Sequence, residues 1–272
     1  MNDNLSKDKN FLEPEIVNEF IELLEKKNTK KLKKKIQNFH SSEIAAYLQI
    51  LNDLNRSRLL KILKKNFDSQ ILVELETIFL EKIINEIDFS ILSKAIGELN
   101  SDDAVSIIES LDEKKRKKLL SKISTKERKF FEENLKFPEN SAGRLMQLEV
   151  VKISQDANVG QVIDFLRNSK DLPKIFFDIY VTDSDNVLIG NVSVSQILTN
   201  KRSMKIIEIM KFKRSCVPID MDQEDVADFF RKRNLTSVAV VDNQDKLQGS
   251  IYVDDIVDVI DNEAEEDLLK LG

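Results

Sequence analysis

The sequence predicts a multi-domain fold in which an all-α superhelical N-terminal domain is followed by an α/β tandem. Three observations predict it. Apolar residues recur at helical spacing up to about residue 135, the pattern then changes to short β-branched runs between Asp/Asn/Gly turns, and the order of these runs occurs twice. A length of 272 residues suits two or three domains. With 41% hydrophobic and 33% charged residues, a buried core with a densely charged surface is expected, and a wholly disordered chain is not expected.

The N-terminal domain is expected over residues 1–135. Apolar stripes at helical spacing are formed by Ile16, Val17, Phe20, Leu23 and Leu24, and by Ile44, Tyr47, Leu48 and Leu51. A short motif also repeats: Leu followed by Asn or Asp, then after six residues a pair of Leu or Ile. It begins at Leu51-Asn52, Leu99-Asn100 and Leu111-Asp112. The repeat favours stacked helix pairs; an irregular helical bundle is the alternative.

Two similar α/β units are expected over residues 136–200 and 201–262. The first has strands at 150–153, 178–182 and 187–192 with helices at 159–167 and 193–198. The second has strands at 216–219, 237–241 and 247–253, with helices at 224–233 and from 254 onward. Leu188-Ile189-Gly190 corresponds to Leu247-Gln248-Gly249, each after an Asp/Asn turn. A tandem of such units resembles a cystathionine-β-synthase (CBS) domain pair, whose units pack sheet to sheet around clefts that hold nucleotides.

Two further segments resemble one family. Phe137–Met146, with the sequence FPENSAGRLM, resembles the segment that joins the helical N domain to the CBS pair in MgtE-type magnesium transporters. Val253–Gly272 resembles the family's run from the second CBS domain into its connecting "plug" helix, whose start we place at 263–272. The resemblance implies the cytosolic magnesium-sensing region of a transporter, on the cytoplasmic side of the cell membrane. It also implies a homodimer through the CBS domains and a transmembrane channel domain after Gly272.

Negative charge is concentrated at the C-terminal end. The whole chain carries −6, and residues 242–272 contain ten acidic residues against Lys246 and Lys270. On a helix, Asp254, Asp258 and Asp261 share one face, and each like-charge pair at such spacing costs about 0.2–0.5 kcal/mol. A bound cation would relieve this cost, and Mg²⁺ suits carboxylate and water oxygens. A solvated charged helix is the alternative.

The resemblance also implies the ligands. Carried over by motif, the family's cytosolic Mg²⁺ ligands fall on Asp102, Gly143, Asp222, Asp255, Asp258, Glu263, Glu266 and Asp267. Ser106 and Asn234 stand where Asp is expected, which predicts weaker or differently hydrated sites. In the family, Mg²⁺ bridges acids of the N domain, the CBS domains and the connecting helix, and the compaction closes the pore.

ATP is a second candidate cofactor. The nucleotide pattern of CBS units is Gly, then Thr or Ser, then Asp. The first unit keeps the hydroxyl as Ser193 with Gln196 in place of the acid, whereas the second has Tyr252 in place of the hydroxyl and keeps an acid, taken as Asp254. The alternative function is therefore a stand-alone CBS-pair protein that binds adenine nucleotides or serves as a scaffold.

Other functional classes have little support in the sequence. A phosphate-binding loop, an HExxH motif and a dinucleotide fingerprint are all lacking, and His40 is the single histidine, so we expect no enzyme. Cys216 is the single cysteine, and no apolar window is long enough for a transmembrane helix, so a soluble, cytosolic chain is expected. The acidic balance disfavours nucleic acid as a partner. The lysine run Lys30–Lys35 is interpreted as a solvated helix face, with anionic lipid or nucleic acid binding as the alternatives.

Overall fold

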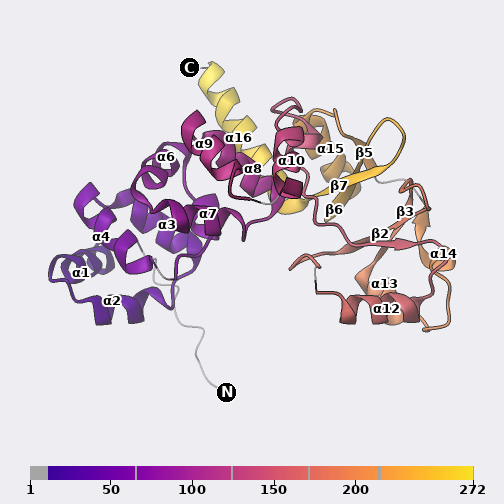
Figure 1. Cartoon of the computed structure of the whole chain (residues 1–272), viewed down its shortest axis with the longest axis horizontal. Helices are drawn as coiled ribbons and strands as arrows, with labels where there is room; N and C mark the ends of the chain where they lie inside the picture. Colours follow the sequence, from indigo (N-terminus) through magenta and orange to yellow (C-terminus); the bar gives the residue numbers. More distant parts are fainter. Residues whose placement is uncertain (1–11, 65, 124, 171, 213–215, 272) are drawn as a thin grey trace. The chain divides into compact units, whose positions relative to one another are not determined.

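The computed structural model describes residues 12–64, 66–123, 125–170, 172–212 and 216–271, without the side chains of 125–127, 129, 130, 265–267 and 271. The chain forms two compact units, coloured along the sequence in Figure 1. The first, here called the helical unit, comprises Met1–Leu99 and Ser106–Ser124; the second, the mixed unit, comprises Asn100–Val105 and Thr125–Gly272. Helix α8 (Ser101–Ser110) contributes its first residues to the mixed unit and the rest to the helical unit.

The helical unit consists of short helices that pack against one another. Its elements are α1 (Pro14–Glu25), α2 (Thr29–Ile36), α3 (Ser41–Ile50), α4 (Asp53–Leu63), α5 (Gln70–Val73), α6 (Thr77–Glu86), α7 (Phe89–Ile96) and α9 (Glu113–Leu120). The rings of Phe20, Phe39 and Tyr47 stack in its core, with the Phe20 and Tyr47 centroids 4.3 Å apart. Stacked aromatic rings of this kind bury a large apolar area, which ties α1 to α3.

The Leu-Asn/Asp repeat has an atomic counterpart. Asn52 and Asp112 each cap the helix that follows, accepting a hydrogen bond from the backbone N–H three residues on. Four residues after the cap, Arg56 donates to the carbonyls of Leu48 and Leu51. Arg116 donates to the carbonyls of Ile108 and Leu111 in the same way. Two of the three repeats thus fasten a helix to the open C-terminal end of the one before it, whereas the repeat at Leu99-Asn100 has Ala104 in place of the arginine.

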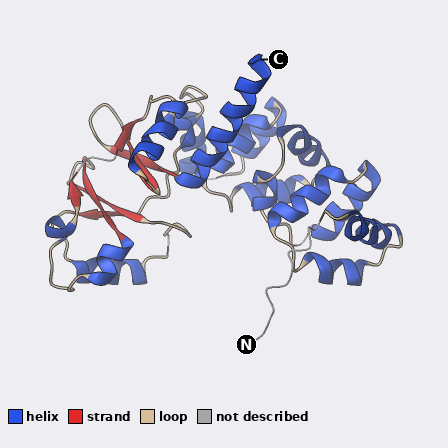
Figure 2. Ribbon diagram, turned by 180° about the vertical axis from the view of Figure 1, so that it is seen from behind, coloured by secondary structure: helices blue, strands red, loops and turns tan. Residues whose placement is uncertain are grey.

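The mixed unit contains two sheets. In the first, β1 (Lys152–Ser154) pairs in parallel with β2 (Asp178–Thr182), which pairs antiparallel with β3 (Leu188–Ser193), and β3 with β4 (Lys211–Phe212). Helices α12 (Val159–Asn168), α13 (Val194–Thr199) and α14 (Ile206–Ile209) accompany this sheet, with α12 and α13 on one of its faces in both views (Figures 1 and 2).

The second sheet repeats the order of the first. Strand β5 (Cys216–Pro218) pairs in parallel with β6 (Ser237–Val241), and β6 pairs antiparallel with β7 (Leu247–Tyr252). Helix α15 (Gln223–Arg233) lies between β5 and β6 in the chain, and α16 (Val253–Leu271) follows β7. Helices α10 (Thr125–Asn134) and α11 (Ala142–Leu145) precede the two sheets.

Both hairpin turns are built in the same way. Asp183 Oδ1 accepts from the backbone N–H groups of Asp185 and Val187, and Asp242 Oδ1 accepts from those of Gln244 and Lys246. Each turn ends on a residue with positive φ, Asn186 or Asp245. These turns also join the sheets, because Leu188 N–H donates to Asp245 O at 2.9 Å and Leu247 N–H donates to Asn186 O at 3.0 Å. The duplication predicted from the sequence therefore extends to individual hydrogen bonds.

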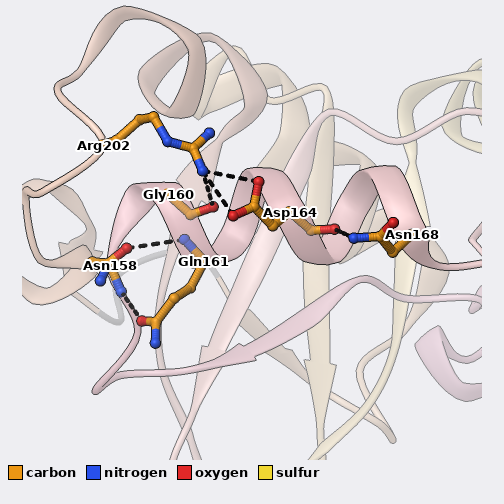
Figure 3. Close-up of polar contacts among 6 residues, drawn as sticks. All are labelled: Asn158, Gly160, Gln161, Asp164, Asn168 and Arg202. Atoms are coloured by element: carbon orange, nitrogen blue, oxygen red, sulfur yellow. Dashed lines mark hydrogen bonds and ion pairs between the residues drawn. The ribbon is translucent and has the colours of Figure 1, made fainter.

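The segment before α14 holds the start of α12 (Figure 3). Arg202 donates to both carboxylate oxygens of Asp164, at 2.7 and 2.9 Å, and to the carbonyl of Gly160. Asn158 and Gln161 form a reciprocal capping box, each accepting from the other's backbone N–H at 2.9 Å.

The predicted fold class is confirmed, and the strands at 178–182 and 237–241 have the predicted bounds. The elements α11, α14 and β4 were not predicted, because two to four residues are too few to show a period. Helix α16 runs without interruption from Val253 to Leu271, so no break in structure marks the start of the connecting segment at residue 263.

Gly190 and Gly249 occupy equivalent positions in the two units, and each allows another backbone to approach. A Cβ on Gly190 would lie 2.2 Å from the Lys211 carbonyl oxygen, and one on Gly249 would lie 2.5 Å from that of Gln147. We expect Gly190→Ala to lower the free energy of unfolding by roughly 1–3 kcal/mol, because the backbone of β4 would have to move.

Gly97→Ala is the matched control. Its Cβ would meet its nearest neighbours at 3.6 Å, and Gly97 has φ −72°, so stability should be unchanged or slightly increased. Thermal unfolding of both variants measures the difference, and equal stability of the two would contradict this account.

Candidate metal centre

The start of α8 is fastened to residues 147–149, a segment that pairs with β7, the strand that leads into α16. Ser101 Oγ donates to Glu149 Oε2 at 2.8 Å and accepts from Leu148 N–H at 2.8 Å. Gln147 in turn exchanges two backbone hydrogen bonds with Ser250 on β7, at 2.8 and 2.9 Å. These bonds place the first acids of α8 beside the first turns of α16.

Helix α16 carries acids next to its buried face. Ile256 and Val259 are buried in the core of the second sheet, whereas Asp254 and Asp258 are exposed. Asp255 is half-buried, and its carboxylate accepts the backbone N–H of Tyr252 at 3.3 Å. Carboxyl groups from three segments thus influence one another's ionisation, and we name them the acidic cluster: Asp102, Asp103, Glu149, Asp254, Asp255 and Asp258.

Several of these acids resist ionisation. Burial, with a smaller contribution from Glu149, raises the pKa of Asp102 to about 6. The pKa of Asp103 is raised to about 7 by burial and by repulsion from Asp102 and Asp254. For Asp255, burial and the charges of Asp102 and Asp254 raise the pKa to about 9. The protein therefore holds protons at neutral pH that free carboxylates would have released.

The cluster lacks compensating cations. None of its six carboxyl groups forms an ion pair with a described residue. Asp102 is only 8% exposed, and its Oδ1 is buried without a hydrogen-bond partner. A buried acceptor of this kind is costly unless a proton or a cation reaches it.

Within the described residues, no three His, Cys, Asp or Glu side chains converge closely enough to enclose a metal ion. Mg²⁺ can be bound by fewer protein groups, because it keeps several waters and needs only one or two carboxylates.

A second group of predicted ligands lies around the joining segment. The backbone of Gly143 is buried, with its N–H donating to Ile219 O at 2.8 Å and its carbonyl accepting from Asn134 Nδ2 at 2.9 Å. Asp222 is exposed and caps α15 by accepting from Glu224 N–H at 2.9 Å. Ser141 pairs with Asp222, and Gln223 Nε2 donates to Glu263 Oε1 at 2.6 Å. Gly143, Asp222 and Glu263 are therefore linked through their neighbours, separately from the acidic cluster.

This chain departs from the family pattern at two positions. Asn234 adopts φ 52° and ends α15, a conformation that Asn tolerates better than most residues. Ser106 is exposed on α8. The side chains of Glu266 and Asp267 lie outside the described residues, so their role stays a prediction.

Glu149 is a member of the cluster that no pattern in the sequence indicates. It lies on an irregular segment after Met146, where neither helical nor strand periodicity indicates a direction for its side chain.

The two nucleotide half-sites differ in construction. Ser193 Oγ donates to Gln196 Oε1 and caps α13, and the adjacent Asp178 accepts from Ser237 Oγ at 2.7 Å and Asn191 Nδ2 at 2.8 Å. In the first unit, Ser193 lies opposite Asp178 in the strand pairing, and in the second unit Tyr252 lies opposite Ser237 in the same way. Tyr252 is therefore equivalent to Ser193. The acid equivalent to Gln196 is therefore Asp255, and the predicted Asp254 lies one residue before it on the exposed face.

A helical domain followed by duplicated α/β units with an acidic cluster defines a class of regulatory region built on a CBS pair. Comparison with known families specifies it further: the MgtE intracellular N domain matches residues 39–140, and the CBS domain matches residues 206–262. The resemblance to the cytosolic region of MgtE-type transporters that the sequence indicates is confirmed.

Curated relatives include the magnesium transporters MgtE of Enterococcus faecalis and Thermus thermophilus. Each is 35% identical, over 136 and 137 residues respectively, which is 50% of this chain and 30% of the relative. The matched region therefore spans less than a third of these transporters.

Two solved structures match most of the chain. The soluble part of a magnesium transporter aligns with TM-score 0.79 and 28% identity, covering 91% of this chain and 98% of that one. The cytosolic domain of the Mg²⁺ channel MgtE in complex with ATP aligns with TM-score 0.83 and 26% identity, covering 89% and 99%. Of the helices described, none is both long and apolar enough to cross a bilayer.

The raised pKa values predict how stability depends on pH. Folded Asp102, Asp103 and Asp255 hold protons that the unfolded chain, with ordinary pKa values near 3.8, releases. Stability should therefore fall as pH rises from about 4 to 9 in the absence of divalent cations. Asp255→Asn should raise the melting temperature at pH 8 and flatten this dependence.

Asp228→Asn is the control, because a hydrogen bond from Lys232 and the charges of Arg231 and Lys232 lower the pKa of Asp228. It should leave the melting temperature unchanged or slightly lower. Destabilisation by Asp255→Asn at pH 8 in a chelator would contradict the repulsion account.

Proposed function

We propose that this chain is the cytosolic magnesium-sensing region of a magnesium transporter or channel. The observation that carries the proposal is the acidic cluster, in which a buried, unpartnered carboxylate oxygen of Asp102 lies with acids of raised pKa from α16. The names of the curated relatives supply the identity of the ion.

The residues of the cluster fit a hydrated Mg²⁺ ion. Asp102 and Asp255 come from different segments, so an ion that contacts both, directly or through its waters, would hold α8 against α16. The bound ion would supply positive charge where the described residues supply none. Because the acids must release protons to bind it, Mg²⁺ affinity should increase with pH.

In this proposal, compaction follows from linkage. Mg²⁺ favours the state in which the acids lie together, and it can shift the equilibrium only by its differential affinity for that state. Gly143, Asp222, Glu263, Glu266 and Asp267 form further candidate ligands. The compact state would close a pore that follows Gly272 in a longer protein.

The family resemblance also suggests the oligomeric state, the location and the partners of this chain. The chain would act as a homodimer through its CBS domains on the cytoplasmic side of the cell membrane, with a transmembrane domain as partner, without nucleic acid and without enzymatic activity. We also propose bounds for four parts of the chain: the N domain at 1–135, the two CBS domains at 136–200 and 201–262, and the start of the connecting helix at 263–272.

Small-angle scattering tests the compaction. Millimolar MgCl₂ at matched ionic strength should reduce the radius of gyration and raise the melting temperature at pH 8. The double variant Asp102→Asn/Asp255→Asn should lose most of both responses, since it removes a ligand from each segment. Asp164→Asn, which alters an acid held by Arg202 far from the cluster in sequence, is the matched control. An unchanged radius for the unaltered chain would contradict the proposal.

Adenine-nucleotide binding is the second candidate function. It is favoured by the ATP complex of a structurally similar cytosolic domain and by the hydroxyl retained at Ser193. In the first half-site, Ser193 and Gln196 would face the ribose, although Asp178 places a carboxylate beside it.

Titration calorimetry with ATP measures this directly. Saturable heat is expected, and Ser193→Ala should weaken binding whereas Ser184→Ala, at an exposed turn of the same unit, should not. Circular dichroism verifies that loss of the Ser193 cap leaves the fold intact. Absence of heat at millimolar ATP would exclude this function and would leave the magnesium proposal untouched.

A further inference from the structure

Helix α2 and the residues next to it form the most basic stretch of the chain. Residues 26–37 contain seven lysines and no acid. Two of these lysines are neutralised by α1, since Lys26 pairs with Glu22 at 2.7 Å and Lys35 pairs with Glu19 at 2.5 Å. Four others on α2 are exposed and form no ion pair with any described residue, and we call them the α2 lysine face: Lys30, Lys31, Lys33 and Lys34. Glu19 acts on Lys31 only through a weak long-range attraction.

The helical unit has a second lysine run, on α9 and just after it, and most of these lysines contact other residues of the same unit. On α9, Lys117 pairs with Glu113 at 2.6 Å and Lys115 donates to Asn85. Lys118 lies over the ring of Phe89 at 4.1 Å, and Lys122, just after the helix, lies over the same ring at 5.2 Å. The two runs look alike in the sequence, but the structure gives internal contacts to one and leaves most of the other facing solvent.

Like charges on adjacent turns of a short helix repel one another. The α2 lysine face therefore lowers the stability of the fold, and no ion pair with a described residue offsets this cost. Leu32, the residue that anchors α2, is 0% exposed and Ile36 is half-buried, so the helix has no fully exposed aliphatic side chain to insert into a bilayer. A partner of this face must therefore be recognised by charge alone.

We propose that the α2 lysine face is an electrostatic docking surface for an anionic lipid bilayer. Lysine ammonium groups are mobile point charges that suit a diffuse anionic surface, whereas nucleic-acid recognition favours Arg forks and exposed aromatic rings. The α2 face offers neither an Arg nor an exposed ring. The contact would be weak and reversible, with each lysine raising membrane partitioning about fivefold. It goes beyond the proposed magnesium sensing and does not depend on it.

The test uses the full chain with vesicles of phosphatidylcholine alone and of equimolar phosphatidylcholine and phosphatidylglycerol, in a chelator and again in millimolar MgCl₂. Co-sedimentation with only the anionic vesicles is expected, and it should decline as salt is raised. Replacing the four lysines of the α2 face by Gln should lower the partition coefficient at least about 100-fold.

The matched control removes the same number of charges from exposed lysines elsewhere, by Lys61→Gln, Lys114→Gln, Lys201→Gln and Lys205→Gln. It should retain binding, and circular dichroism should show both variants folded. Equal loss in the two variants, equal binding to neutral vesicles, or no binding to anionic vesicles would overturn the proposal. So would retention of duplex DNA or RNA without vesicle binding. Scattering without lipid tests magnesium sensing separately, so the two proposals can fail independently.

Discussion

Repulsion among carboxylates is the constraint on which the mixed unit depends. Asp102 and Asp103 enter it from α8, Asp254 and Asp255 from α16, and Glu149 from the segment that ties these helices together. Burial adds to the repulsion, because it removes the water that would otherwise screen these charges. Two agents can lower the resulting cost, protons and cations. The same acids therefore couple the stability of the fold to pH, and in the proposed function they would also couple it to a divalent ion.

The surrounding structure keeps these acids together in spite of their repulsion. Ser101 holds Glu149, and Gln147 is paired with Ser250 on β7, which continues directly into α16. Ile256 and Val259 fasten α16 to the core of the second sheet. Hydrophobic burial and backbone hydrogen bonds thus stabilise an arrangement that electrostatics alone would oppose. An arrangement of opposed forces is easily shifted by a ligand, and the proposed sensing role requires such a shift.

Regular, repeated features were the ones the sequence could predict. The Leu-Asn/Asp motif corresponds to the capping residues Asn52 and Asp112 and to the arginines that follow them, and the two Asp turns correspond to matched hairpins. Short or irregular elements such as β4 and α11 left no periodic signal. Residue register was also beyond the sequence, since only strand pairing shows that Asp255, and not Asp254, is equivalent to Gln196.

The sequence by itself determined the fold class, the duplication and the concentration of acids at the C-terminal end, because period, turn residues and charge are local properties. Only the tertiary structure decided which acids meet. Asp102 and Asp255 are more than 150 residues apart, and their shared burial and repulsion arise from the packing of α8 and α16. It also distinguished two similar lysine runs, since the partners of a charged side chain are set by what folds against it. Local pattern predicts elements, whereas burial and pairing between distant segments exist only once the chain has folded.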